Sequence, residues 1–166
     1  MHEIQIRPFK EEDWASLWEG IKPVFREGET YTFAPDISEE EAYQVWITLP
    51  QQTYVAVDKE DRIIGTYFIK PNQATLGAHI CNCGYIVSSS HRGKGIARML
   101  CLHSLEQAQV LGFRGMQFNA VVSTNHIAVA LWLKLGFEKI GTVPEGFYSK
   151  KFGFVDTFIL FKSITP

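Results

Sequence analysis

One segment near the middle of the chain constrains its fold more than any other. Residues 85–97 read Tyr-Ile-Val-Ser-Ser-Ser-His-Arg-Gly-Lys-Gly-Ile-Ala, which predicts the end of a strand, a short polar loop and the start of a helix. Two glycines at this junction, Gly93 and Gly95, allow a ligand to approach the backbone closely. The first N–H groups of a helix lack partners within the helix, and the helix dipole favours an anion beside them. The segment therefore predicts a site for a phosphate group.

The distribution of charge also points to a small anionic ligand. The chain carries 16 basic and 18 acidic residues, a balance that argues against a general binder of nucleic acid. No Asp or Glu lies between Asp61 and Glu106, although that span holds Arg62, Lys70, Arg92, Lys94 and Arg98. The Gly-x-x-x-x-Gly-Lys-Ser/Thr pattern of P-loops is absent. A small polyanion is therefore the favoured ligand, and a solvated helix start without a ligand is the alternative.

The rest of the sequence predicts one mixed α/β domain over residues 1–166. Strands are expected at 3–8, 53–57, 63–69, 78–88, 116–122, 137–140 and 155–161. Helices are expected around 14–25, after a capping box formed by Ser38 and Glu41, and at 92–111 and 125–135. A Gly-rich stretch from Gly141 to Gly153 is expected to join the last two strands. Consecutive central strands predict antiparallel pairing, and the later strand–helix–strand units predict parallel pairing, so a mixed sheet with helices on both faces follows.

Several classes of protein are not expected from this sequence. No apolar run approaches the roughly 20 residues that span a bilayer, so no membrane partner is expected. The start, Met1-His2-Glu3-Ile4, has neither the basic region nor the apolar region of a secretion signal. Three cysteines without a Cys-x-x-Cys pair predict neither a disulfide framework nor a metal site. These observations favour a soluble cytoplasmic protein.

Two motifs resemble those of the GCN5-related N-acetyltransferase (GNAT) family. Arg92-x-x-Gly95-x-Ala97 matches the family's acetyl-CoA pyrophosphate motif. Residues 125–137 match its second motif, Asn-x-x-Ala-x-x-Leu-Tyr-x-x-Leu-Gly-Phe, with Trp132 in place of the tyrosine. The resemblance implies the GNAT fold, in which a mostly antiparallel sheet of about seven strands has its fourth and fifth strands splayed apart. It also implies acetyl-CoA as co-substrate, no metal, and a possible homodimer.

The resemblance assigns cofactor-binding residues one by one. The pantetheine arm of acetyl-CoA enters the gap between the splayed strands of the family and bonds to strand backbone. By resemblance, Ile86 and Val87 line this arm, and Asn125 contacts it. The residues implied to hold the pyrophosphate are Arg92, Gly93, Lys94, Gly95, Ile96 and Ala97.

A narrower resemblance concerns the acceptor. Residues 79–87 and 118–125 are similar to fungal N-acetyltransferases that detoxify proline analogues such as azetidine-2-carboxylate. In that group an Asn of the splayed strand and two Asn residues six apart lie in the active site, which implies roles for Asn82, Asn119 and Asn125. Tyr31 and Phe33 follow the first predicted helix, where the family places substrate contacts. The acceptor implied is therefore a small amine.

The individual side chains limit the chemistry that this resemblance permits. Many family members carry a catalytic Glu on the splayed strand, but here Asn82 stands near that place, and an amide orients a group without accepting its proton. The alternative role for Asn82 is to satisfy backbone groups at a bulge. Trp132 is expected to pack in the core, because indole is no useful acid. His79 is left as an alternative base, since imidazole titrates near neutrality.

These expectations lead to one favoured function and two alternatives. The favoured function is transfer of acetyl from acetyl-CoA to a small amine, such as a proline analogue, by direct attack, with Asn82 and Asn119 as the catalytic pair. The first alternative keeps the enzyme but makes its acceptor a protein N-terminus or lysine. The second is a CoA-binding sensor module without catalysis. It remains an alternative because the splayed strand lacks the catalytic Glu of many family members.

Overall fold

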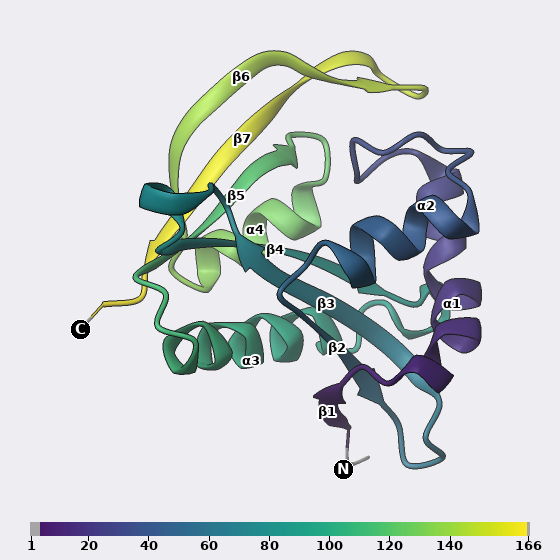
Figure 1. Ribbon diagram of the computed structural model, residues 1–166. Coiled ribbons are helices and arrows are strands. Elements are labelled where there is room, and N and C mark those ends of the chain that lie inside the picture. Colours follow the sequence, from purple (N-terminus) through teal and green to yellow (C-terminus); the bar gives the residue numbers. More distant parts are fainter. Residues whose placement is uncertain (1–3, 166) are drawn as a thin grey trace.

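The computed structural model describes residues 4–165, which form a seven-stranded sheet of order β1-β2-β3-β4-β5-β7-β6 (Figure 1). The strands are β1 Gln5–Pro8, β2 Gln52–Val57, β3 Ile63–Pro71, β4 Ile80–Val87, β5 Gly115–Val122, β6 Glu138–Ser149 and β7 Gly153–Ser163. The helices are α1 Trp14–Glu27, α2 Glu39–Tyr43, α3 Ile96–Val110 and α4 His126–Lys134. Short 3-10 helices occur at η1 Glu11–Asp13, η3 Thr75–Gly77 and η4 Ser89–His91, and η2 Gln44–Thr48 is a π-helical segment. Only β4 and β5 pair in parallel among these strands. The predicted mixed, mostly antiparallel sheet is confirmed.

Two hydrophobic cores lie on opposite faces of the sheet. Alternate residues of β3, such as Tyr67 and Ile69, pack under α3 and α4 with Leu100 and Trp132. The intervening Phe68 packs on the other face, in the core that α1 and α2 cover. Figure 1 shows α3 and the α1–α2 pair on opposite sides of the central strands. This alternation decides which side chains of β3, β4 and β5 share a face.

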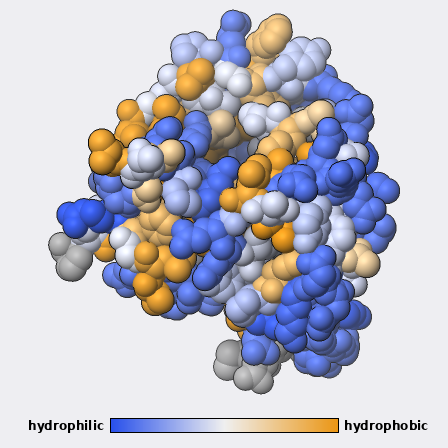
Figure 2. Space-filling model, viewed as in Figure 1, coloured by the Kyte–Doolittle hydropathy of each residue, from blue (hydrophilic) through white to orange (hydrophobic). Residues whose placement is uncertain are grey.

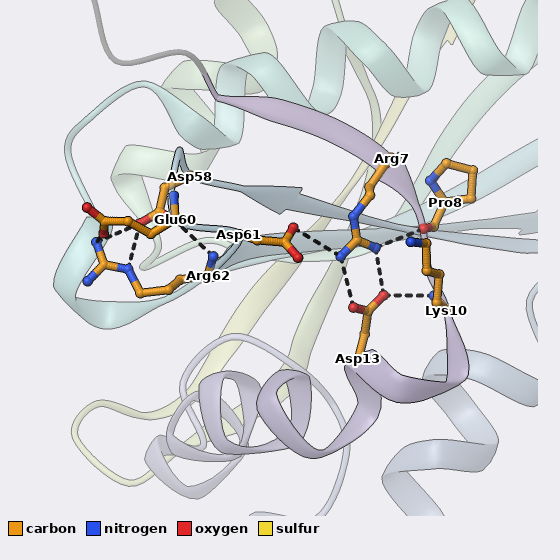
Figure 3. Close-up of polar contacts among 8 residues, drawn as sticks. All are labelled: Arg7, Pro8, Lys10, Asp13, Asp58, Glu60, Asp61 and Arg62. Atoms are coloured by element: carbon orange, nitrogen blue, oxygen red, sulfur yellow. Dashed lines mark hydrogen bonds and ion pairs between the residues drawn. The ribbon is translucent and has the colours of Figure 1, made fainter.

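A network of charged side chains fixes the turn from β1 into α1 (Figure 3). Arg7 donates to both carboxylate oxygens of Asp13, at 2.8 and 2.9 Å, and Lys10 N donates to the same carboxylate at 2.7 Å. This bidentate contact lowers the pKa of the buried Asp13 carboxyl. Asp58 and Arg62 form a second pair that closes the β2–β3 hairpin. The network therefore fixes the chain between β1 and the start of α1.

The predicted start of the third helix is wrong by four residues. Residues 92–95 form a turn, and α3 begins at Ile96. Gly93 and Gly95 have φ angles of +76° and +78°, a left-handed conformation that cannot belong to a right-handed helix. The glycines therefore shape the loop before the helix, as a close approach to a ligand requires.

The predicted Gly-rich loop from Gly141 to Gly153 is also wrong. β6 continues to Ser149 and β7 begins at Gly153, so most of this stretch is a long hairpin. Its register shifts between Val143 and Phe147, and a Cβ at Gly146 would collide with the Thr157 hydroxyl. Here glycine permits close strand contact at a bulge. The strand predicted from residue 3 begins at Gln5, and residue 3 lies outside the described residues.

The hairpin reaches back over the loop of residues 28–37, between α1 and α2 (Figure 1). The buried Ser149 hydroxyl donates to Glu29 Oε2 at 2.7 Å and accepts from the backbone N–H groups of Lys151 and Phe152. One side chain thus caps the hairpin turn and ties it to the loop. In the same view, apolar surface patches are interrupted by polar residues (Figure 2). No helix within residues 4–165 is long and apolar enough to cross a membrane.

Candidate active site

The centre of the sheet opens where β4 and β5 separate. The two strands pair only at Ile80↔Gly115 and Cys81↔Met116, which confirms the predicted splay. The N–H of Arg114, just before β5, donates to the carbonyl of His79, whereas Ile80 accepts a hydrogen bond from Asn72 on the β3 side. Odd-numbered residues of β4 therefore direct their backbone groups toward β5. Beyond Cys81 these groups belong to Cys83, Tyr85 and Val87, and they face the gap.

Tyr31 closes part of this gap in the present structure. Its hydroxyl donates to the Tyr85 carbonyl at 2.6 Å and accepts from the Tyr85 N–H at 2.7 Å. Burial raises the pKa of Tyr31, so the hydroxyl stays protonated and able to donate. Phe33 stacks against Tyr31 with ring centroids 6.0 Å apart. The hydroxyl of Thr30, the residue before Tyr31, is buried and has no hydrogen-bond partner within residues 4–165.

Replacing Tyr31 with phenylalanine should lower the free energy of unfolding by about 1–3 kcal/mol, because two backbone groups of Tyr85 lose their shared partner. Urea denaturation of the ligand-free protein measures this change. Tyr43→Phe is a matched control, since its hydroxyl bonds Glu11 at the surface and its loss should cost well under about 1 kcal/mol. Equal effects of the two substitutions would contradict a structural role for the Tyr31 hydroxyl.

Amide side chains gather where the strands separate. Asn82 Nδ2 donates to the Gln117 carbonyl at 2.8 Å and so adds one link between β4 and β5 after their backbone pairing ends. Asn119 Nδ2 donates to Asn72 Oδ1 at 2.7 Å, and Asn119 Oδ1 accepts from Gln117 Nε2 at 3.1 Å. We call Asn72, Asn82, Gln117 and Asn119 the amide row. The structure brings the two predicted catalytic residues, Asn82 and Asn119, into this one row.

The amide row lies on the face that α1 and α2 cover. Met116 and Phe118 point into the core under α3 and α4, so Gln117 points to the opposite face, and Asn119 joins it through their hydrogen bond. Tyr31 and Phe33 pack in the core of that face. Asn82 Oδ1 has no hydrogen-bond partner among residues 4–165 and remains able to accept. The predicted acceptor residues therefore share one side of the gap.

Asn125 stands apart from the amide row. Its Oδ1 accepts from Ala128 N at 3.3 Å, so it caps α4 where the chain leaves β5. Ile86 is buried in the core under α1 and α2, whereas the backbone of Val87 faces the gap. Of the two predicted arm-lining residues, Val87 is the one that offers backbone groups to a ligand.

The start of α3 has the features of an anion site. A Cβ at Gly93 or Gly95 would meet no atom within 4 Å, so both glycines face open space. Gly95 precedes the helix without a capping side chain, which leaves the N–H groups of Ile96 and Ala97 without partners in the helix. Arg92 forms an exposed ion pair with Glu27 at 3.3 Å, a weak contact that a phosphate group can replace. These residues fit the pyrophosphate of a CoA thioester.

The Acetyltransferase (GNAT) family model matches residues 14–137, the span that holds the splayed strands and both motifs. The chain belongs to this GNAT family. N-acetyltransferase aca1 of Schizosaccharomyces pombe is 37% identical over 111 residues, which are 66% of this chain and 53% of aca1. The chain thus spans about half the length of that relative.

Solved GNAT structures share the whole architecture. A GCN5-related N-acetyltransferase from Kribbella flavida superposes with a TM-score of 0.91 and 37% identity over 96% of this chain and 97% of that chain. A phosphinothricin acetyltransferase from Sinorhizobium meliloti, solved in complex with AcCoA, has a TM-score of 0.82 and 22% identity over 96% of this chain and 88% of that chain. The second likeness establishes a shared fold only.

The other titratable candidates in this GNAT chain do not face the gap as bases. His79 is exposed and precedes β4, at the end where β4 and β5 still pair. Cys81, Cys83 and Cys101 are buried, and burial raises the pKa of Cys101 to about 12. Within the described part of the chain, no three His, Cys, Asp or Glu side chains are grouped to hold a metal ion.

Three features of this site are not predictable from local sequence patterns. The Tyr31 contact joins residues 54 apart, and the Asn72–Asn119 contact joins residues 47 apart, so no local pattern reveals either. Lys70 also lies beside the amide row, opposite Asn82 in the β3–β4 register. Its only signal in the sequence is a basic residue near the end of an apolar strand in the span without acids.

Proposed function

We propose that the chain transfers an acetyl group from acetyl-CoA to the amine of a small molecule, with proline analogues or other amino acids as acceptors. The observation that carries this proposal is an amide row, with no carboxylate on β3, β4 or β5, beside a gap lined by strand backbone. Family membership supports the acetyl transfer. The neutral amides support a small acceptor that itself bears a carboxylate, because a strand Glu would repel such a molecule.

Each part of the site has a distinct task in this reaction. The N–H groups around Gly95 hold the pyrophosphate, and the backbone groups of Val87 bond the pantetheine arm. Acetyl-CoA supplies the thioester that the neutral amine attacks. The Tyr85 N–H donates to the thioester oxygen as negative charge develops there, which requires the Tyr31 hydroxyl to leave this N–H. Holding the two reactants together contributes roughly 7–11 kcal/mol to the lowering of the barrier.

The proton of the amine leaves without a protein base of suitable pKa. Asn82 and Asn119 cannot accept it, and the carboxylates of the chain are absent from the strands that flank the gap. Water or a water chain takes the proton instead. We therefore expect kcat/KM to rise with pH well above 7, following the fraction of neutral amine. A plateau below about pH 7 would contradict this and would point to a protein base in the gap.

A screen of acceptors, monitored by release of free CoA thiol, tests the proposal. Azetidine-2-carboxylate and 4-hydroxyproline should react faster than lysine, spermidine and N-terminal peptides between about pH 6 and 9.5. Preference for a peptide would show that the acceptor is a protein rather than a small molecule. Preference for spermidine would show that the acceptor needs no carboxylate. Binding of acetyl-CoA with no transfer to any amine would support the CoA-binding module instead.

A further inference from the structure

Lys70 lies directly beside the amide row. It pairs with Asn82 in the β3–β4 register, and directly opposed residues on antiparallel strands have Cβ atoms about 4.5–5.5 Å apart. Its Nζ is 5.5 Å from the centroid of the Phe68 ring, which packs in the core under α1 and α2. Lys70 therefore projects from the same face as Asn82, on the side of the gap where Tyr31 and Phe33 lie.

The contact with Phe68 also gives the position of the Lys70 ammonium group relative to β4. A Cβ on Gly84 would lie 2.6 Å from Phe68 Cε1, so this ring covers the backbone of Gly84, next to Tyr85. The Lys70 ammonium therefore lies beside the ring that covers Gly84, one residue before Tyr85, whose backbone groups face the gap. Asn82 and Val87 are five residues apart, or about 16 Å along a strand, so Lys70 is too far from the start of α3 to hold the pyrophosphate.

Lys70 brings a positive charge into this half-buried place without a compensating anion. No ion pair joins it to an Asp or Glu among residues 4–165. Its neighbours are the Asn82 amide on the paired strand and the Phe68 ring, neither of which neutralises an ammonium group. A partly desolvated charge is favourable only when an opposite charge pairs with it. The arrangement suits a ligand that arrives with its own negative charge.

We propose that Lys70 binds the carboxylate of the acceptor while Asn82 Oδ1 accepts a hydrogen bond from the acceptor's amine. This assignment rests on the proposed function and narrows its acceptor to α-amino and α-imino acids, whose amine and carboxylate are attached to one carbon. Neighbouring side chains on two paired strands then bind two neighbouring groups of one small molecule. Lys70 is the residue that selects for the acid over its neutral amide.

The test compares each acceptor with its carboxamide. The wild type should acetylate azetidine-2-carboxylate at least tenfold more efficiently than azetidine-2-carboxamide. Lys70→Met should lower kcat/KM for the acid by about 10- to 100-fold, mainly through KM, and change the value for the carboxamide less than about threefold. Lys70→Arg should restore part of the loss. Lys139→Met is the matched control, because Lys139 is also a strand lysine over a ring, 4.4 Å from the centroid of Phe158 on the distant hairpin.

A binding measurement separates this inference from the proposed function. Calorimetry on the CoA-saturated protein should show N-acetyl-azetidine-2-carboxylate binding at least tenfold tighter than its carboxamide, and Lys70→Met should remove that difference. Equal losses for acid and carboxamide, or no preference for the acid in either measurement, would overturn the role of Lys70. No release of CoA thiol with any acceptor, with the acid still preferred in binding, would overturn the proposed transfer and leave the carboxylate site standing.

Discussion

Replacing Gly95 with valine should abolish the acetyl-CoA-dependent rise in melting temperature. Gly95 has a φ of +78° and borders open space at the start of α3, so a branched side chain there would both strain the turn and occupy the phosphate site. Ligand at 100 times its Kd stabilises a protein by about 2.7 kcal/mol, and this increment should disappear. Thermal melting with and without millimolar acetyl-CoA measures it.

The destabilisation caused by backbone strain has to be distinguished from the loss of acetyl-CoA binding. Gly112 ends the same helix with a φ of +83° and also has open space around it. Gly112→Val should therefore lower the melting temperature of the free protein about as much as Gly95→Val does, yet keep the full shift with acetyl-CoA. If acetyl-CoA still raises the melting temperature of the Gly95→Val protein, the pyrophosphate binds elsewhere. The turn before α3 would then be the start of a helix without a ligand.

Replacing Asn82 with alanine should lower kcat/KM by roughly tenfold to a thousandfold, equivalent to about 1.4–4 kcal/mol. The change removes the carbonyl that is free to orient the amine, and it removes the link to the Gln117 carbonyl. Asn119→Ala, on the other strand of the gap, should act in the same direction. The Kd for acetyl-CoA should change little in either variant, as isothermal titration calorimetry would show.

The second role of Asn82 makes the comparison of turnover and binding decisive. Its bond to Gln117 supports the point where β4 and β5 part, so a purely structural residue would lose acetyl-CoA affinity and stability together with activity. Equal losses in kcat/KM and in cofactor affinity would assign Asn82 to the architecture of the gap. Loss of turnover alone would assign it to the acceptor.

Local chemistry explains which parts of the fold were predictable. The Ser38 capping box is present, with Ser38 N donating to Glu41 Oε2 at 2.8 Å and Glu41 N to Ser38 Oγ at 3.1 Å, because both partners lie within one turn. The glycines before α3 predicted a backbone cradle for the same reason. Gly146 contributed to the wrong prediction of a loop, because in the sequence a glycine that allows two strands to approach closely looks the same as a glycine in a loop.

The candidate site was predictable residue by residue but not as an assembly. Asn82 and Asn119 were found by resemblance, whereas their partners Gln117 and Asn72 are set by how far the strands have parted. The amide row exists only because β3, β4 and β5 lie side by side, which no single motif encodes. The homodimer and the cytoplasmic location stay predictions, because one chain tests neither.

The Tyr31 hydroxyl has a consequence for the order of events during turnover. It holds the Tyr85 peptide, and its loop is tied through Glu29 to Ser149 at the hairpin tip. On the proposed function, the incoming thioester displaces this hydroxyl, and the Tyr31 and Phe33 rings reach the positions in which they contact the acceptor only afterwards. Initial-velocity patterns should then be those of a compulsory-order ternary-complex mechanism, with the nucleotide as leading substrate and the acceptor unable to bind productively to the free enzyme.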